Sequence, residues 1–262
     1  MRRRGRGLSA SGNNPFDSLA VDYDDTFTNT VIGRVMRAAV WRRLAAVFPA
    51  DSHVLELNCG TGVDAAWLGE RSVRVLATDA SQGMVDVARA RGIEAARWNA
   101  EDIGTLADQP GVGPFDGALS NFGGLNCVDD LVAVASGLGR CVRPGGTAVL
   151  CVMGQIVPWE WIWYLGHGNP RAAFRRLRRR TVWRGLTIRY PSVGSLRTTF
   201  DPWWVSRRVW ALGALVPPSY VEPWAARHPR ALDRLDRMER RVETWPLVAR
   251  LADHYVIELE RR

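Results

Sequence analysis

The sequence predicts an α/β protein whose core is a mostly parallel, doubly wound β-sheet. Apolar runs that suit buried strands alternate with helical patterns from Val54 to about Met153, which is typical of a parallel sheet covered by helices. The first run leads directly into a glycine turn at Gly60 and Gly62, and the second ends at Asp79. Open α/β sheets bind ligands at the carboxyl ends of their strands, so we expect the functional site there.

The glycine turn and the acid together indicate a nucleoside cofactor. Glycines at the start of a helix allow a nucleotide-like ligand to lie against the backbone. A carboxylate that closes the next strand, as Asp79 does, can accept hydrogen bonds from both ribose hydroxyls.

Two classes of cofactor compete for this site. Residues 60–65, G-T-G-V-D-A, satisfy the loose dinucleotide pattern G-x-G-x-x-G/A. However, Glu56 lies in the first strand and Asn58 opens the turn, where a pyrophosphate favours an apolar strand and a bare glycine. An acid beneath the turn better suits a ligand with a cationic amino group.

Residues 54–62, V-L-E-L-N-C-G-T-G, resemble motif I of the class I S-adenosylmethionine-dependent methyltransferases, usually written V-L-D/E-L-G-C-G-T-G. Asn58 replaces the first glycine of that motif. Asparagine is the non-glycine residue that best tolerates a left-handed backbone, so the departure is mild.

The resemblance extends over roughly residues 16–154, and more loosely over the rest. It is carried by segments similar to the family's later motifs and N-terminal segment, at residues 78–84 (T-D-A-S-Q-G-M), 99–102 (N-A-E-D), 115–122 (F-D-G-A-L-S-N-F), 143–146 (R-P-G-G) and 16–24. The resemblance implies that S-adenosyl-L-methionine binds here, with S-adenosyl-L-homocysteine as the product. The implied cofactor residues are Tyr23, Glu56, Asn58, Gly60, Asp79, Ala80, Met84, Asn99, Ala100, Glu101 and Asn121.

The same resemblance implies a seven-stranded sheet with the last strand inserted antiparallel. We expect one methyltransferase domain over 15–262, preceded by a disordered basic tail at 1–14. Within it, 15–50 would form an N-terminal helical cover, 51–154 the cofactor-binding core and 155–191 a lid insertion. Residues 192–262 would complete the sheet and its helices, with strands at 209–216 and 255–259 and mostly helix from 223 to 241.

All 35 basic residues are arginine, and this composition excludes several enzyme classes. Phosphate-binding P-loops, pyridoxal-phosphate enzymes and short-chain dehydrogenases each need a lysine. Arginine does not deprotonate at working pH and cannot replace it. The hydride-transfer interpretation is therefore disfavoured.

The formal net charge of +8 raises the question of a nucleic-acid or membrane partner. Much of the charge lies in residues 171–184, where Ala173, Phe174 and Leu177 would share one face of an arginine-rich helix. A solvated helix face, weak contact with a membrane surface, an anionic substrate and RNA all fit this pattern. We find no recognised nucleic-acid module, so a nucleic-acid partner is disfavoured. No apolar run could span a bilayer, and the four cysteines show no C-x-x-C pairing. We therefore expect a cytoplasmic protein with buried free thiols and no metal ion.

The insertion at 155–191 contains a tryptophan cluster just beyond the fifth strand. Trp159, Trp161, Trp163 and Tyr164 would form an acceptor pocket for a greasy or planar substrate, or else simply pack in the core. His167, Tyr164 and Glu160 are the candidates for a general base, should the acceptor need one. Thr181–Trp183 and Leu186–Tyr190, on either side of Arg184 and Gly185, predict a hairpin.

We therefore predict a methyltransferase that acts on a small, hydrophobic acceptor such as a natural product, a quinone or a lipid-like molecule. An RNA-modifying methyltransferase and a non-methylating S-adenosylmethionine-binding protein are the alternatives. The acceptor, the methylated atom and the oligomeric state are left open.

Overall fold

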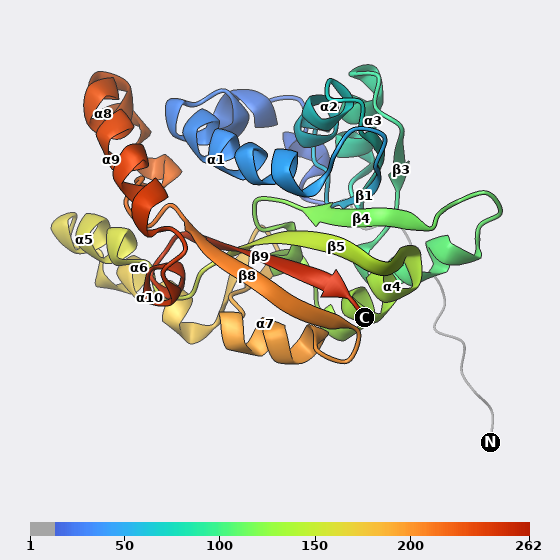
Figure 1. Ribbon diagram of the computed structural model, residues 1–262. Helices are drawn as coiled ribbons and strands as arrows, with labels where there is room; N and C mark the ends of the chain where they lie inside the picture. Colours follow the sequence, from blue (N-terminus) through green and yellow to red (C-terminus); the bar gives the residue numbers. More distant parts are fainter. Residues whose placement is uncertain (1–13) are drawn as a thin grey trace.

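A seven-stranded sheet forms the centre of the molecule in the computed structural model, which describes residues 14–262 (Figure 1). The predicted basic tail therefore lies outside the described residues except for Asn14. The strand order is β3-β2-β1-β4-β5-β9-β8. The strands are β1 (His53–Leu57), β2 (Arg74–Asp79), β3 (Ala95–Arg97), β4 (Phe115–Ser120), β5 (Val142–Met153), β8 (Trp204–Leu212) and β9 (His254–Arg261).

Strands β1 to β5 are parallel, and β9 runs antiparallel between β5 and β8. This arrangement confirms the predicted sheet. Strand β8 ends at Leu212, earlier than the sequence indicated, because the backbone turns at Gly213 with φ +75°. The carboxylate of Glu239 accepts the backbone N–H groups of Gly213, Leu215 and Val216 at 2.7, 2.8 and 2.8 Å, so these residues cannot continue a strand.

Helices cover both faces of the sheet (Figure 1). One face carries α1 (Val31–Val47), α2 (Val63–Gly69) and α3 (Gln82–Ala90), and the other carries α4 (Leu131–Cys141) and α7 (Val193–Phe200). The apolar face of α1, including Met36 and Leu44, packs on Val54 and Val149 of the sheet. Successive strand residues point to opposite faces, so Leu55 and Leu150 belong to the second core beneath α4.

Short helical turns complete the N-terminal and central parts of the chain. These are η1 (Asp17–Leu19), η2 (Asp24–Thr28), η3 (Ala100–Asp108) and η4 (Gly124–Cys127). The C-terminal region holds η6 (Ser219–Val221), α8 (Glu222–Arg227), α9 (Pro229–Val242) and α10 (Pro246–Arg250). The helix expected over 223–241 is thus divided at His228, because Pro229 fixes its own φ and disfavours helical backbone in the residue before it. Among residues 14–262, no helix is long and apolar enough to cross a membrane.

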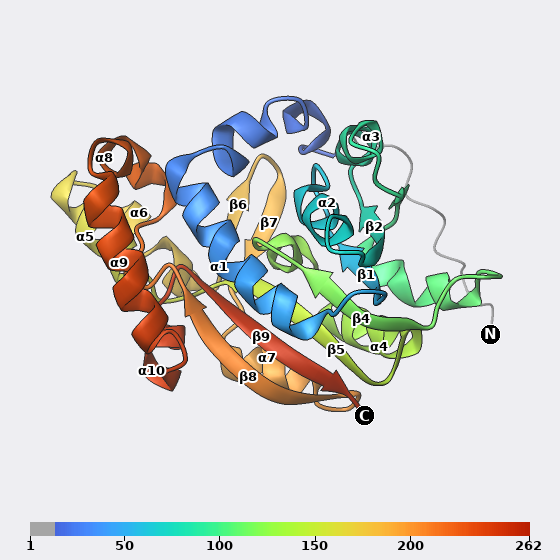
Figure 2. The ribbon, with the colours of Figure 1, turned by 45° about the horizontal axis from the view of Figure 1, so that its top comes forward.

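The insertion after β5 contains α5 (Pro158–Gly166), α6 (Pro170–Ala173), η5 (Arg175–Arg178), β6 (Arg180–Trp183) and β7 (Leu186–Arg189). The β6–β7 hairpin confirms the predicted one, and its turn residues Arg184 and Gly185 both have positive φ. Figure 2 shows this hairpin projecting away from the large sheet toward the N-terminal residues.

The sequence predicted a single arginine-rich helix within residues 171–184, and this prediction is wrong. Phe174 leaves helical geometry between α6 and η5, and Phe174 and Leu177 are exposed while Ala173 is buried. The backbone breaks because Arg176 turns inward and is bound there by buried acidic partners.

Candidate cofactor and acceptor site

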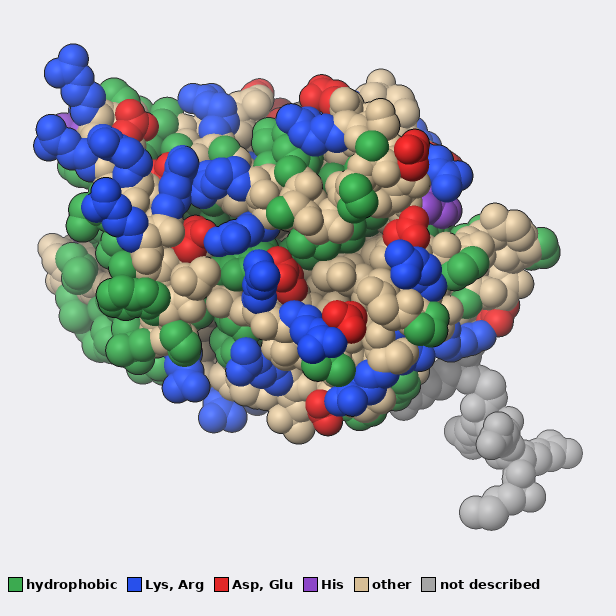
Figure 3. Space-filling view, in the orientation of Figure 1, with side chains coloured by type: hydrophobic (Ala, Val, Ile, Leu, Met, Phe, Trp, Pro, Cys, Tyr) green, Lys and Arg blue, Asp and Glu red, His purple; other side chains and the backbone are tan. Residues whose placement is uncertain are grey.

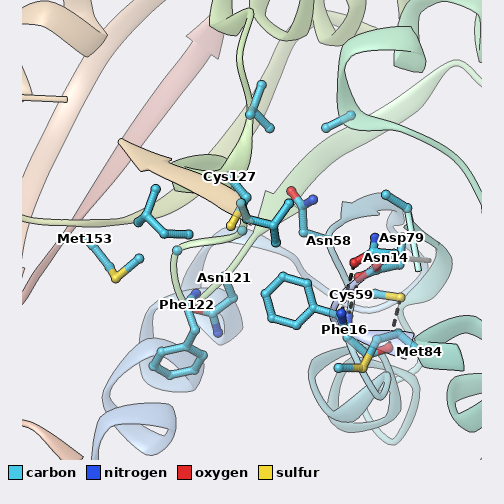
Figure 4. Close-up of a pocket in the computed structure, with 18 of the residues that line it drawn as sticks. Asn14, Phe16, Asn58, Cys59, Asp79, Met84, Asn121, Phe122, Cys127 and Met153 are labelled. Carbon is cyan, nitrogen blue, oxygen red and sulfur yellow. Dashed lines mark hydrogen bonds between the residues drawn. The ribbon is translucent and has the colours of Figure 1, made fainter. Parts of the chain in front are cut away.

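A cavity of about 650 Å³ lies at the carboxyl ends of β1, β2 and β4 (Figure 4). Asp79 and Met84 lie toward one end of it, and Phe122 and Met153 toward the other. Residues of the N-terminal segment and of the β6–β7 hairpin complete the wall. Ten of the predicted cofactor residues line this cavity, namely Tyr23, Asn58, Gly60, Asp79, Ala80, Met84, Asn99, Ala100, Glu101 and Asn121.

The turn after β1 takes the left-handed backbone that its sequence indicates. Asn58, Gly60 and Gly62 have φ of +53°, +54° and +76°, which confirms the expectation for Asn58. A Cβ added at Gly60 would meet no atom within 4 Å, so open space lies beside the backbone there. By contrast, a Cβ at Gly124 would lie 2.3 Å from the Asn58 Cβ, so the neighbouring loop also needs glycine. The turn therefore leaves room for a ligand against its backbone.

Asp79 is oriented by the backbone at the end of β2. Its Oδ2 accepts the N–H of Gly60 at 2.9 Å, and its Oδ1 accepts the N–H of Ser81 at 2.8 Å. Burial raises the pKa of Asp79, whereas these two hydrogen bonds act in the opposite direction. The carboxylate is thereby fixed beside the glycine turn, where the two ribose hydroxyls of a nucleoside would lie.

A buried polar cluster lies in the cavity wall beside Phe122. The Asp64 carboxylate accepts hydrogen bonds from Trp41 at 2.7 Å and Asn121 at 2.9 Å, and pairs with Arg37 at 2.6 Å. The Arg37 guanidinium also lies 4.7 Å from the centre of the Phe122 ring. Arg37 and Asp64 both line the cavity.

The sequence interpretation missed Arg37 and Asp64. Asp64 follows the glycine turn in the first turn of α2, and that position could have indicated it. Arg37 falls on the apolar stripe of α1 together with Met36, Val40 and Leu44, and this helical spacing could have distinguished it from the exposed arginines.

Glu56 does not line the cavity, in contrast to the expectation that it contacts the cofactor. Its side chain points into the interior beneath the turn and is 1% exposed. Burial, followed by the nearby Asp64 charge, raises its pKa well above the usual range. The Glu56 Oε2 atom has no hydrogen-bond partner. A buried carboxyl group in this environment favours its neutral form.

The tryptophan cluster is also displaced from the cavity. Trp159, Trp161, Trp163 and Tyr164 lie on α5, and none is among the lining residues. Trp161 packs on Phe174 with ring centres 5.7 Å apart, and Trp163 and Tyr164 pack on Tyr220. Trp161 therefore packs within the insertion, whereas Trp163 and Tyr164 pack α5 against the C-terminal region.

The β6–β7 hairpin, and not α5, supplies part of the cavity wall. Trp183 reaches over the cavity and packs on Phe16 with ring centres 5.6 Å apart. Tyr190 is buried, and its hydroxyl lies 3.1 Å from that of Thr181. The cavity wall around Phe122 and Met153 is apolar, and the apolar lining residues also include Cys127, Val128, Val182, Trp183, Leu186 and Ile188.

None of the three candidate bases faces the cavity. His167 is exposed and contacts the carbonyl oxygen of Trp163 at 2.7 Å. Tyr164 packs on Tyr220, and buried Glu160 binds Arg175 at 2.6 Å and Arg176 at 3.1 Å. Among the described lining residues there is no histidine, and burial raises the pKa of the Cys127 thiol to about 11. The thiol is therefore protonated near neutral pH.

Comparison with known proteins finds similarity to methyltransferases over the segment that carries the sequence motifs. Residues 54–146 match the family described as "Methyltransferase domain". The chain is 32% identical over 143 residues to the demethylmenaquinone methyltransferase of Clavibacter sepedonicus, a match that covers 52% of this chain and 55% of that protein. The chain thus spans about half the length of the relatives it matches.

Solved structures share the fold over most of the chain. The S-adenosylmethionine-dependent methyltransferase from Mesorhizobium loti is 18% identical, with a TM-score of 0.53 over 86% of this chain and 98% of that one. The [4+2]-cyclase SpnF is 15% identical, with a TM-score of 0.53 over 86% of this chain and 80% of that one. The chain therefore has the class I methyltransferase fold, and its residues 54–146 match a methyltransferase domain.

Proposed function

We propose that this chain transfers the methyl group of S-adenosylmethionine to a flat, hydrophobic small molecule of the quinone type. The observation that carries this proposal is the division of one cavity into two chemically different ends. One end combines the glycine turn with Asp79, the other carries the apolar side chains of Phe122 and Met153, and the β6–β7 hairpin with Trp183 adds apolar wall to the same cavity. We call this apolar part of the cavity the chamber.

The residues present fit the cofactor that the family uses. The open space beside Gly60 would accept it, and Asp79 would bind both ribose hydroxyls. Met84 would pack against the adenine ring, and the Arg37–Asp64 pair lies where the methionyl end would extend toward the chamber. When bound, the sulfonium of S-adenosylmethionine supplies an activated methyl group with a good leaving group.

The apolar chamber supports the choice of acceptor. Aromatic and aliphatic walls favour a planar ring system. The paired hydroxyls of Thr181 and Tyr190 could hydrogen-bond to an oxygen on that ring. Relatives that match this chain are demethylmenaquinone methyltransferases, which agrees with a quinone-like acceptor.

The protein would promote the reaction mainly by position. Methyl transfer from a sulfonium is an in-line displacement, so alignment of the two ligands and exclusion of water provide most of the catalysis. Phe122 and Trp183 would orient the acceptor ring and keep water from the reacting atoms.

The test combines calorimetry with a transfer assay. Asp79→Ala should weaken S-adenosylmethionine binding by about 2 kcal/mol, roughly 30-fold, because it removes a carboxylate that would accept two hydrogen bonds from the ribose. Asp86→Ala is the control, since Asp86 is exposed on α3 and bonds to Gln82. Wild-type protein should methylate a short-chain demethylated naphthoquinol, as measured by mass spectrometry.

Each failure of this test has a distinct meaning. Unchanged binding by Asp79→Ala, or a preference for NAD, would contradict the cofactor assignment. Tight cofactor binding without transfer to any naphthoquinol would reject the acceptor. Transfer to RNA in the same assay would replace the small-molecule function with the RNA-modifying one.

A further inference from the structure

One stretch of the insertion carries positive charge without any acid. Residues 161–191 contain eight arginines and no aspartate or glutamate. Arg175, Arg176 and Arg189 pair with acids elsewhere in the chain. Five others are exposed and form no salt bridge with any described residue, namely Arg171, Arg178, Arg179, Arg180 and Arg184.

Large apolar side chains are exposed among these arginines. Phe174 and Leu177 lie between the first two of them and are 41% and 42% exposed. Val182 and Trp183, near the tip of the hairpin, are 75% and 40% exposed. A soluble surface rarely presents several large apolar groups so close together, and such a patch indicates a binding surface.

We propose that residues 171–184 form a docking surface for an anionic lipid bilayer. We call these residues the lid surface. Its arginines would bind lipid phosphates, and its apolar side chains would enter the boundary between headgroups and acyl chains. Tryptophan and arginine both favour that boundary.

The apolar component distinguishes a bilayer from RNA as the partner. A nucleic-acid backbone would use the arginines but gives no favourable environment to Leu177 and Val182. A bilayer uses both kinds of side chain. The exposure of aliphatic groups between unpaired arginines therefore favours lipid.

The lid surface is continuous with the cavity. Val182 and Trp183 are exposed near the hairpin tip, and both also line the cavity. Docking at this surface would therefore open the chamber directly toward the bilayer. That a lipid-like acceptor enters by this path rests on the proposed function, whereas the docking itself does not.

Vesicle binding tests the docking without any methyl transfer. The full chain is mixed with vesicles of phosphatidylcholine alone or of phosphatidylcholine with phosphatidylglycerol, and bound protein is measured by flotation. We expect binding to the anionic vesicles, weakened by added salt because the surface charges are exposed. The triple variant Arg171→Gln, Arg178→Gln and Arg180→Gln should bind roughly 100-fold more weakly, about fivefold for each arginine.

The matched control removes three arginines from a different surface. Arginine side chains also gather over α8 and α9, visible at the upper left of Figure 3. In α9 they alternate with Asp233 and Asp236. The triple variant Arg230→Gln, Arg234→Gln and Arg237→Gln changes the net charge equally and should bind vesicles nearly as well as wild type.

A second variant tests the apolar contribution. Phe174→Ser with Leu177→Ser keeps every arginine and should still lose most binding, with its melting temperature measured to verify folding. Equal losses in the two arginine variants, or no preference for anionic vesicles, would overturn the proposal. RNA binding at physiological salt without vesicle binding would overturn it in favour of a nucleic-acid surface.

Discussion

Arg176 and Asp253 form an ion pair 2.7 Å long although 77 residues separate them, and both are almost fully buried. The Arg176 guanidinium also donates to the carbonyl oxygens of Gly154 and Asp253 and lies 3.1 Å from Glu160. Burial alone would raise the pKa of Asp253, but Arg176 and His254 together hold it well below its usual range. This pair fastens the insertion to the junction where β5 ends and β9 begins.

Removing Arg176 should destabilise the protein strongly. Arg176→Leu leaves the buried carboxylate of Asp253 without its main partner, which typically costs about 3–5 kcal/mol. Urea denaturation measures the change, and Arg178→Leu serves as the control because Arg178 is exposed and should change stability by less than about 0.5 kcal/mol.

The pH dependence of this loss follows from the depressed pKa of Asp253. The pair stabilises the fold at pH values above the ordinary aspartate pKa of 3.8, and this contribution is lost as the pH falls from there toward the lower folded-state pKa. The unfolded states of wild type and Arg176→Leu titrate alike, and burial without Arg176 raises the pKa of Asp253 in the variant. The difference in stability between the two proteins should therefore shrink as the pH falls from that raised pKa toward the depressed wild-type one. Equal stability of the two proteins at neutral pH would contradict the anchoring role.

Local patterns were enough to predict the cofactor half of the molecule. Each parallel strand is a short apolar run, and the turns at Asn58 and Gly185 are formed by residues that tolerate positive φ. The motifs follow strands whose carboxyl ends meet at one edge, so their order in the chain also places them around one cavity.

The acceptor half could not be predicted in the same way. Whether the arginine-rich segment continues as a helix depends on Asp253, which is far away in sequence and draws Arg176 inward. The tryptophans of α5 and the single Trp183 have equally suitable chemistry for an acceptor wall. Their roles differ because the hairpin packs over the cavity and α5 does not, and this placement depends on tertiary contacts that the local sequence does not reveal.

Trp183 and Trp161 should respond differently to truncation, given the proposed function. Trp183→Ala removes part of the cavity wall and should raise the acceptor Michaelis constant about tenfold, roughly 1.4 kcal/mol, with cofactor affinity nearly unchanged. Trp161→Ala removes packing against Phe174 and should lower stability by about 2 kcal/mol with little effect on the acceptor. Melting temperature and steady-state kinetics on both variants separate the two effects. The opposite pattern would show that the acceptor binds at the tryptophans of α5.

Glu56→Gln should stabilise the cofactor-free protein increasingly as the pH rises. Burial and the neighbouring Asp64 raise the pKa of Glu56 well above its ordinary value of 4.5, with Arg37 opposing them. A folded-state pKa above the unfolded one means that the fold is favoured while Glu56 is protonated and is penalised as the pH rises from 4.5 through the folded-state pKa. Glutamine has nearly the same shape as glutamate and stays neutral, so it avoids this penalty. The full penalty is about 1.4 kcal/mol for each pKa unit by which the folded-state pKa of Glu56 exceeds the unfolded-state pKa. Melting temperatures of both proteins should therefore be similar near pH 5 and diverge in favour of Glu56→Gln by pH 8. If Glu56→Gln is instead the less stable protein at pH 8, Glu56 is ionised in the fold and stabilised by Arg37, and the buried acid beneath the turn carries a negative charge.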